Sequence, residues 1–72
     1  MVKAVVLVQS PKKLIAVKLK QVNSVNESFA VSGQFYAVAV IQVENLSEIK
    51  DVTTDIQKIN GVERTETMVQ VQ

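Results

Sequence analysis

Few side chains in this chain are suited to catalysis. The 72 residues include no histidine and no cysteine, which removes the common nucleophile and general-base pairs together with zinc and other soft-metal sites. The carboxylates form no close pair, and Glu48, Asp51 and Asp55 recur at helical spacing beside an apolar stripe, which is typical of a solvated helix face. Two glycines are too few for a phosphate-binding loop. We therefore predict no catalytic residue, no metal site and no cofactor.

Two polar features remain as candidates for binding. The run "RTET", Arg64 to Thr67, places two hydroxyls on one side of a strand and two opposite charges on the other. It forms either an ordinary exposed edge strand or the polar rim of a small-ligand site at a subunit junction, where hydroxyls and free amides bind a carboxylate or an ammonium. Tyr36 is either an acid in a dimeric α+β barrel enzyme, where Glu27 is the other candidate, or an interface aromatic, as its apolar strand favours.

Charge is divided unevenly along the chain. Five lysines precede the first acid, Glu27, and the rest of the chain carries three basic residues against seven acids. A basic patch around Lys12 and Lys13 could attract nucleic acid, but it holds no arginine and no interleaved aromatic residue, both of which nucleic-acid modules commonly use. We therefore favour a solvated helix face and expect no direct DNA binding.

Residues 1–22 predict a strand followed by a helix. β-Branched residues dominate 1–9, and they are apolar on both sides of the expected strand. Ser10 and Pro11 suit a helix start. The next segment also alternates as a strand would, but its helical spacing favours a helix that buries Ile15, Leu19 and Val22.

The remaining elements are a hairpin, a second helix and a last strand. Gly33 and Gln34 make a tight connection between strands at 25–32, which Asn23 and Ser24 precede, and 35–43. In the first of these strands, one side is shared by Val25, Glu27, Phe29 and Val31. An amphipathic helix follows, with its apolar stripe at Leu46, Ile49, Val52, Ile56 and Ile59. Asn45 and Glu48 form an approximate capping box, Gly61 stops the helix, and 62–72 closes as a strand.

This order predicts an α+β fold of the ferredoxin-like βαββαβ type. Right-handed crossovers place both helices on one face of a four-stranded antiparallel sheet and leave the other face open. Strand 35–43 is nevertheless apolar on both sides, with Phe35, Ala37, Ala39, Ile41 and Val43 on one and Tyr36, Val38 and Val40 on the other. Large exposed apolar patches are rare on monomers, so we expect the protein to dimerise through the open face, at Val5, Leu7, Tyr36, Val38 and Val40.

Two motifs resemble those of a known family. Residues 25–36, "VNESFAVSGQFY", resemble the "V-x-E-x-Y-x-V-T-G-x-Y-D" signature of the ligand-binding domain of Lrp/AsnC transcription regulators, the regulation of amino-acid metabolism (RAM) domain. Residues 59–67, "INGVERTET", resemble that family's "I-P-G-V-x-R-T-x-T". The resemblance implies a ferredoxin-like fold, dimers that pair through their sheets, and rings such as octamers.

The resemblance also implies a function and a site. Residues 1–72 would be a single stand-alone RAM domain without a helix-turn-helix DNA-binding domain, acting on transcription or metabolism indirectly by assembling with itself or with full-length regulators. An amino acid or related effector would bind between dimers, near Ser32, Gly33, Gln34, Phe35, Tyr36, Thr65 and Thr67. Tyr36 stands where the family has an acid that can pair with an ammonium, and Asn60 replaces its usual proline.

No apolar run reaches the roughly 20 residues that span a bilayer and no signal-peptide pattern is present, so a cytoplasmic protein is expected.

Overall fold

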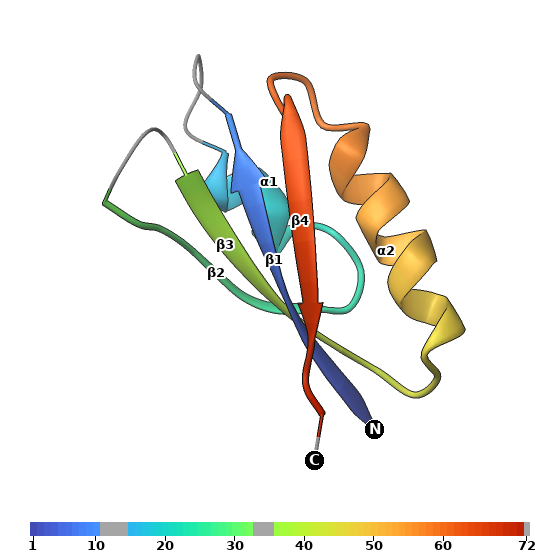
Figure 1. The fold of residues 1–72 in the computed structure, drawn as a ribbon. Coiled ribbons are helices and arrows are strands. Elements are labelled where there is room, and N and C mark those ends of the chain that lie inside the picture. Colours follow the sequence, from blue (N-terminus) through green and yellow to red (C-terminus); the bar gives the residue numbers. More distant parts are fainter. Residues whose placement is uncertain (11–14, 33–35, 72) are drawn as a thin grey trace.

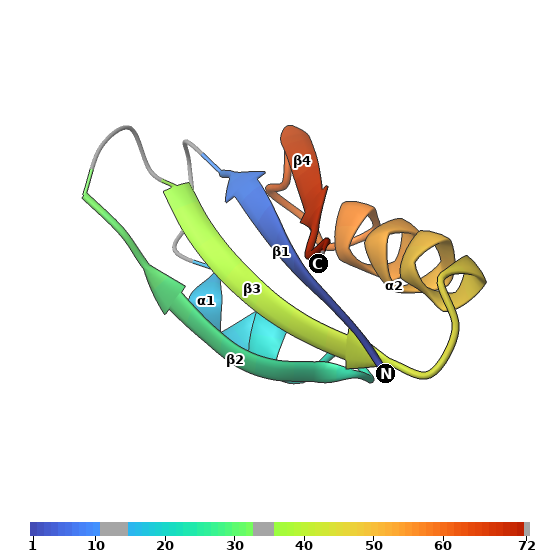
Figure 2. The ribbon, with the colours of Figure 1, turned by 60° about the horizontal axis from the view of Figure 1, so that its bottom comes forward.

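The computed structural model describes residues 1–10, 15–32 and 36–71 as two layers, a sheet and a pair of helices (Figure 1). The elements in chain order are β1 (Val2–Gln9), α1 (Ala16–Lys20), β2 (Val25–Ala30), β3 (Tyr36–Val43), α2 (Ser47–Gln57) and β4 (Arg64–Val69). All pairings in the sheet are antiparallel, in the order β2-β3-β1-β4. Figure 2 shows β2 and β4 at the two edges. The predicted ferredoxin-like arrangement is confirmed.

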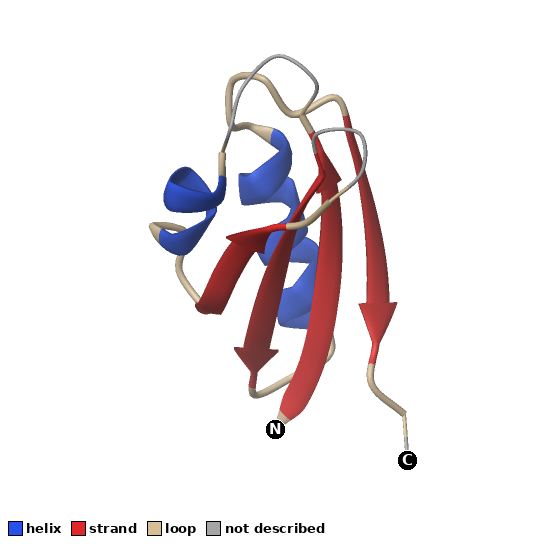
Figure 3. Ribbon diagram, turned by 90° about the vertical axis from the view of Figure 1, so that its left-hand side faces the viewer, coloured by secondary structure: helices blue, strands red, loops and turns tan. Residues whose placement is uncertain are grey.

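Both helices lie on the same side of the sheet (Figure 3). β1 and β3 supply the centre of the core because their alternate residues, Val6 and Val8 on β1 and Ala39 and Ile41 on β3, point to the helices and are buried. The described part of the chain contains no helix with the length and apolar content needed to cross a membrane.

The first helix is short, and its predicted helical reading is confirmed. α1 covers the β2 end of the sheet with Ile15 and Leu19, which are 2% and 0% exposed. Val22 packs against the same core from the turn that follows. The hydroxyl of Ser28 on β2 donates a hydrogen bond to the carbonyl of Ala16 at 2.6 Å, which joins the helix to the edge strand. The predicted helix start at Pro11 lies outside the described residues.

The second helix begins next to its predicted capping signal, but its N-cap residue is Leu46, with no side-chain cap, and only half of the capping box forms. A carboxylate oxygen of Glu48 accepts hydrogen bonds from the backbone amides of Glu44 and Asn45, at 2.9 and 3.2 Å, so the glutamate half of the capping box is formed. Ile49, Val52 and Ile56 are buried. The prediction was wrong at Leu46, which is 62% exposed because it stands at the cap position, before the first turn faces the sheet. Gly61 has φ 107°, the left-handed conformation expected after the helix.

Strand β2 departs from simple alternation. Its register with β3 shifts between Val25 and Glu27, which pair with Ile41 and Val40 respectively. Val25 therefore packs against the core, whereas Glu27 and Phe29 face away from the helices. The prediction that these three residues share one side was wrong at Val25, because a bulge inserts one residue and reverses the faces beyond it. The predicted turn at Gly33 and Gln34 lies outside the described residues.

Candidate functional site

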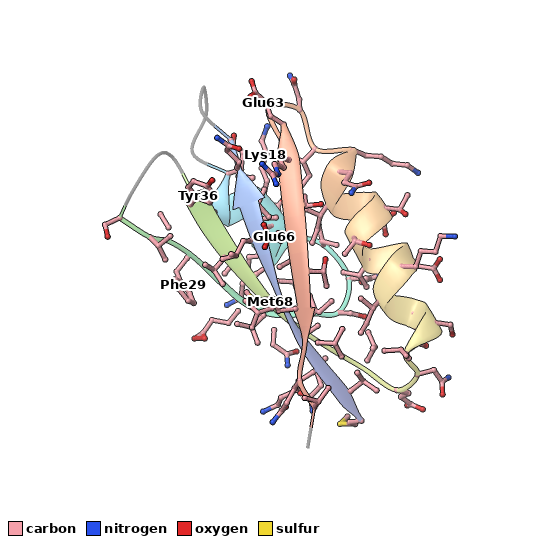
Figure 4. The ribbon with its side chains drawn as sticks, viewed as in Figure 1. Lys18, Phe29, Tyr36, Glu63, Glu66 and Met68 are labelled. Carbon is pink, nitrogen blue, oxygen red and sulfur yellow. The ribbon has the colours of Figure 1, made fainter. Side chains whose placement is uncertain are left out.

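The face of the sheet that the helices leave uncovered is an ordered grid of side chains. Residues that are paired across antiparallel strands point to the same side, so the register defines rows across β3, β1 and β4. The successive rows are Tyr36, Gln9 and Arg64; Val38, Leu7 and Glu66; and Val40, Val5 and Met68. We call the whole surface the open face, and Figure 4 views it with α1 behind the strands.

The middle of the open face is apolar. It comprises Val5, Leu7, Phe29, Val38, Val40 and Met68, here called the apolar rows. Phe29 and Met68, at the two sides of the sheet, are 42% and 49% exposed (Figure 4). Val38 is 6% exposed, yet it does not belong to the core cluster beneath the sheet. Its neighbours on the open face therefore cover it.

All five residues predicted for the dimer interface lie on the open face. Val5, Leu7, Tyr36 and Val40 are half-buried, and Val38 is the buried centre of the group. Phe29 and Met68 also lie on this face, which the sequence alone did not predict. β2 and β4 flank the predicted strands, and their register with β3 and β1 brings both side chains onto the patch.

A broad hollow of about 370 Å³ lies on the β1 and β4 side of the apolar rows. Its lining residues are Lys3, Ala4, Val5, Val40, Met68, Val69 and Gln70. Apart from the ends of Lys3 and Gln70, these side chains offer methyl and methylene groups or a thioether. Such a surface contributes to binding by burial of apolar area and not by polar recognition.

One end of the open face is polar and holds a second, smaller pocket. It has a volume of about 80 Å³ and is lined by Leu7, Gln9, Tyr36, Arg64, Thr65 and Glu66. We call Gln9, Tyr36, Arg64 and Glu66 the polar end. In the described part of the chain, the side chains of Arg64 and Glu66 have no hydrogen-bond or ion-pair partner. Opposite charges that lack partners and share one pocket are free to bind a ligand that carries both.

The two threonines of the "RTET" run face the helices. Thr65 and Thr67 pair with Val8 and Val6, which are buried in the core. The hydroxyl of Thr65 accepts a hydrogen bond from the side-chain amide of Gln57 on α2, at 2.9 Å. Thr65 still borders the small pocket, whereas Thr67 is not among its lining residues. The charges of Arg64 and Glu66, and not the threonine hydroxyls, therefore dominate the polar end.

Of the other predicted ligand residues, the structure describes Ser32 and Tyr36. Ser32 is exposed in the connection between β2 and β3, and Gly33, Gln34 and Phe35 lie outside the described residues. Tyr36 opens β3, is half-buried, and pairs with Gln9 in the row that ends at Arg64. The structure thus brings Tyr36 and Thr65 to one pocket.

Other candidate chemistry is sparse. Among the described residues, no group of three or more acidic, histidine or cysteine side chains could hold a metal ion. Lys18 and Lys20 are exposed on α1. The basic pair expected to attract nucleic acid, Lys12 and Lys13, lies outside the described residues.

Comparison with known proteins gives a consistent result. The family model described as the Lrp/AsnC ligand binding domain matches residues 3–72. The crystal structure of TTHA0845 from Thermus thermophilus is similar, with 31% identity and a TM-score of 0.82 over 100% of this chain and 95% of that one. A hypothetical protein, PHS023 from Pyrococcus horikoshii, shares the fold at 22% identity and a TM-score of 0.84, over 100% of this chain and 92% of that one. No curated protein matches the sequence.

Proposed function

Because the chain belongs to the Lrp/AsnC ligand-binding domain family, we propose that it binds an amino acid or a related small effector and regulates transcription or metabolism indirectly. It does so by assembling with itself, as dimers that build rings such as octamers, or with full-length members of the family. The family is regulatory, and its ligand-binding domain is the part this chain matches. That residues 1–72 form a single ligand-binding domain is part of the same proposal.

The observation that carries the proposal is the division of the open face into apolar rows and a polar end. Six apolar side chains lie on the side of the sheet away from both helices, and two of them, Phe29 and Met68, are close to half exposed. A second copy of this chain is the simplest cover, since the same face on both partners satisfies two-fold symmetry. The polar end then lies at the rim of that contact, where a small effector can reach it.

Regulation follows from coupling between these two parts of one surface. An effector that binds better to one assembly state than to another shifts the population toward the state it prefers. The shift is limited by its differential affinity for the two states. A ligand at the rim of a subunit contact is well placed to have such a preference, because rearrangement of the contact changes what surrounds the ligand.

Native mass spectrometry tests this proposal directly. We expect the purified protein to be a dimer or a multiple of a dimer, and to gain the mass of a bound amino acid when a mixture of the standard amino acids is added. The assembly state or the melting temperature is expected to change on binding, since a ligand stabilises the state that binds it. A monomer that gains no mass from any amino acid contradicts both halves of the proposal.

A further inference from the structure

We propose that Arg64 and Glu66 are the residues that recognise the effector: Arg64 holds the carboxylate and Glu66 the ammonium of a free α-amino acid. This inference rests on the proposed function, since it names the groups that do the binding. The family resemblance expects an acid at position 36 to pair with the ammonium of the effector, but this chain has a tyrosine there. In our proposal Glu66 takes that role.

The first support is the placement of the two charges. Arg64 and Glu66 are two positions apart on β4, so they point to the same face, and their backbones are about 7 Å apart from the rise of an extended strand. Both side chains line the pocket of about 80 Å³. An α-amino acid carries its two charges on neighbouring atoms of one carbon, so two long side chains that converge from this spacing can reach both at once.

The second support is that the two charges do not neutralise each other. Neither side chain has a hydrogen-bond or ion-pair partner among the described residues. The guanidinium of arginine matches a carboxylate with two parallel hydrogen bonds. The carboxylate of glutamate accepts from the donors of an ammonium. A zwitterion therefore satisfies both residues together, whereas a simple anion or cation leaves one of them unsatisfied.

Two neutral groups complete the pocket. Gln9 pairs with Arg64 and Tyr36 pairs with Gln9, so an amide and a phenol stand in one row beside the guanidinium. Each can both donate and accept a hydrogen bond. Tyr36, Glu66 and the apolar Met68 lie on the same face in Figure 4. Leu7 is the member of the apolar rows that lines the pocket, and it forms a nonpolar wall on one side.

The volume of the pocket limits what it holds. About 80 Å³ is well below the roughly 300 Å³ of common small-molecule sites. It accommodates the charged head of an amino acid, and the amino acid's side chain must extend beyond the protomer. The pocket therefore binds the ammonium and carboxylate, which all α-amino acids share. Discrimination among amino-acid side chains comes from groups outside this pocket.

Substitutions at the two charges, with a matched control, test the inference. Native mass titrations of the intact wild-type protein with each standard amino acid identify the tightest binder. That amino acid, its N-acetyl derivative and its carboxamide are then titrated against Glu66→Gln, Arg64→Gln and Glu63→Gln. Glu63 is also an exposed glutamate, but it precedes β4 and does not line the pocket (Figure 4).

We expect Glu66→Gln and Arg64→Gln each to weaken binding of the amino acid roughly 10-fold to 100-fold, the range for a hydrogen bond to a charged group. Glu63→Gln is expected to stay within about two-fold of wild type, because its side chain is solvated. The N-acetyl derivative lacks the ammonium, so it should bind wild type and Glu66→Gln equally. The carboxamide should likewise bind wild type and Arg64→Gln equally.

The outcomes separate the inference from the proposed function. If wild type binds an amino acid and Glu66→Gln binds it equally well, the assignment of Glu66 is overturned while the effector-binding function stands. If all three variants lose binding to the same extent, the effect is a general loss of surface charge and the pocket is not the site. If wild type binds no amino acid, the inference and the effector half of the proposed function both fail. The mass of each assembly reports whether a variant is still folded and associated.

Discussion

Placing a carboxylate in the middle of the apolar rows should separate the subunits without damage to the helix-covered core. Val40 is half-buried on the open face, between Val5 on β1 and Glu27 on β2. Neither of these cross-strand neighbours offers a cation, and the exposed Lys3, which lines the same hollow as Val40, would have to bring its own charge into the contact to pair with an aspartate. We expect Val40→Asp to convert the wild-type dimer, or ring of dimers, into monomers.

The magnitude follows from the burial of Val40. Full burial of a valine side chain contributes about 1.5 to 3 kcal/mol, and Val40 is already half covered, so dimerisation gains about 1 kcal/mol from it in each copy. Burying an unpaired carboxylate instead adds a penalty of at least about 2 kcal/mol a copy. A symmetric dimer counts each effect twice. The total of about 6 kcal/mol corresponds to a dissociation constant raised by roughly four orders of magnitude.

Sedimentation velocity at several protein concentrations measures this change, with circular dichroism to follow folding. Val17→Asp is the matched control: it makes the same substitution on α1, where Val17 is 75% exposed and lies on the helix layer. We expect Val17→Asp to assemble as wild type does. If the folded monomer is unstable, Val40→Asp will unfold at concentrations where wild type is intact, and the wild-type melting temperature will rise with concentration. A wild-type monomer, or a Val40→Asp protein that sediments with wild type, refutes the reasoning.

Three further predictions concern the stability of the protomer. Ile56→Ala should lower the free energy of unfolding by about 2 to 5 kcal/mol because Ile56 is 0% exposed, whereas Leu46→Ala should cost less than about 0.5 kcal/mol at a position that is 62% exposed; urea denaturation measures both. Gly61→Ala should cost about 1 to 2 kcal/mol, because φ is 107° and a Cβ is unfavourable there; an unchanged urea midpoint contradicts this. Glu48→Ala should cost about 1 kcal/mol through loss of two hydrogen bonds at the start of α2, and Glu48→Gln, which retains an acceptor, should recover part of it.

The layer arrangement was predictable because its signals are local. Alternation in β1 and β3 follows from the period of a strand, and the buried positions of α2 follow from the period of a helix. The alternation also separated the two faces of β3 correctly at Val38 and Ala39, which point to opposite sides. Apolar residues on both sides of a central strand in so short a chain were enough to predict an uncovered apolar face.

The composition of that face was less predictable because it depends on register. The bulge between Val25 and Glu27 carries no signature in the residue types, and it decides which side of β2 faces the helices. Phe29 reaches the apolar rows because of that shift, and Met68 reaches them because β4 pairs with β1. Alternation alone predicts which residues of one strand share a face, but it does not predict how that strand aligns with the next.

Which side chains of β4 line the candidate site also depends on register. The sequence predicted the hydroxyls of Thr65 and Thr67 as ligand-binding groups. The register turns both toward the helices, where Thr65 is hydrogen-bonded to Gln57. The charges between and beside them, at Arg64 and Glu66, face the pocket instead. Period-two alternation links these outcomes: a strand that directs its hydroxyls to one side must direct the intervening charges to the other.

In the proposed function, assembly and recognition share one surface, and the order of their residues along the strands matters. On β4, Arg64 and Glu66 precede Met68 on the same face, so the chain passes from polar recognition to apolar contact within five residues, 64–68. A ligand that draws Arg64 and Glu66 together acts one row away from the contact that would join two copies. Because packed interfaces switch between discrete arrangements more readily than they deform, a small adjustment at the polar end can favour one assembly over another. No separate relay is needed between the effector and the subunit contact, because β4 carries residues of both.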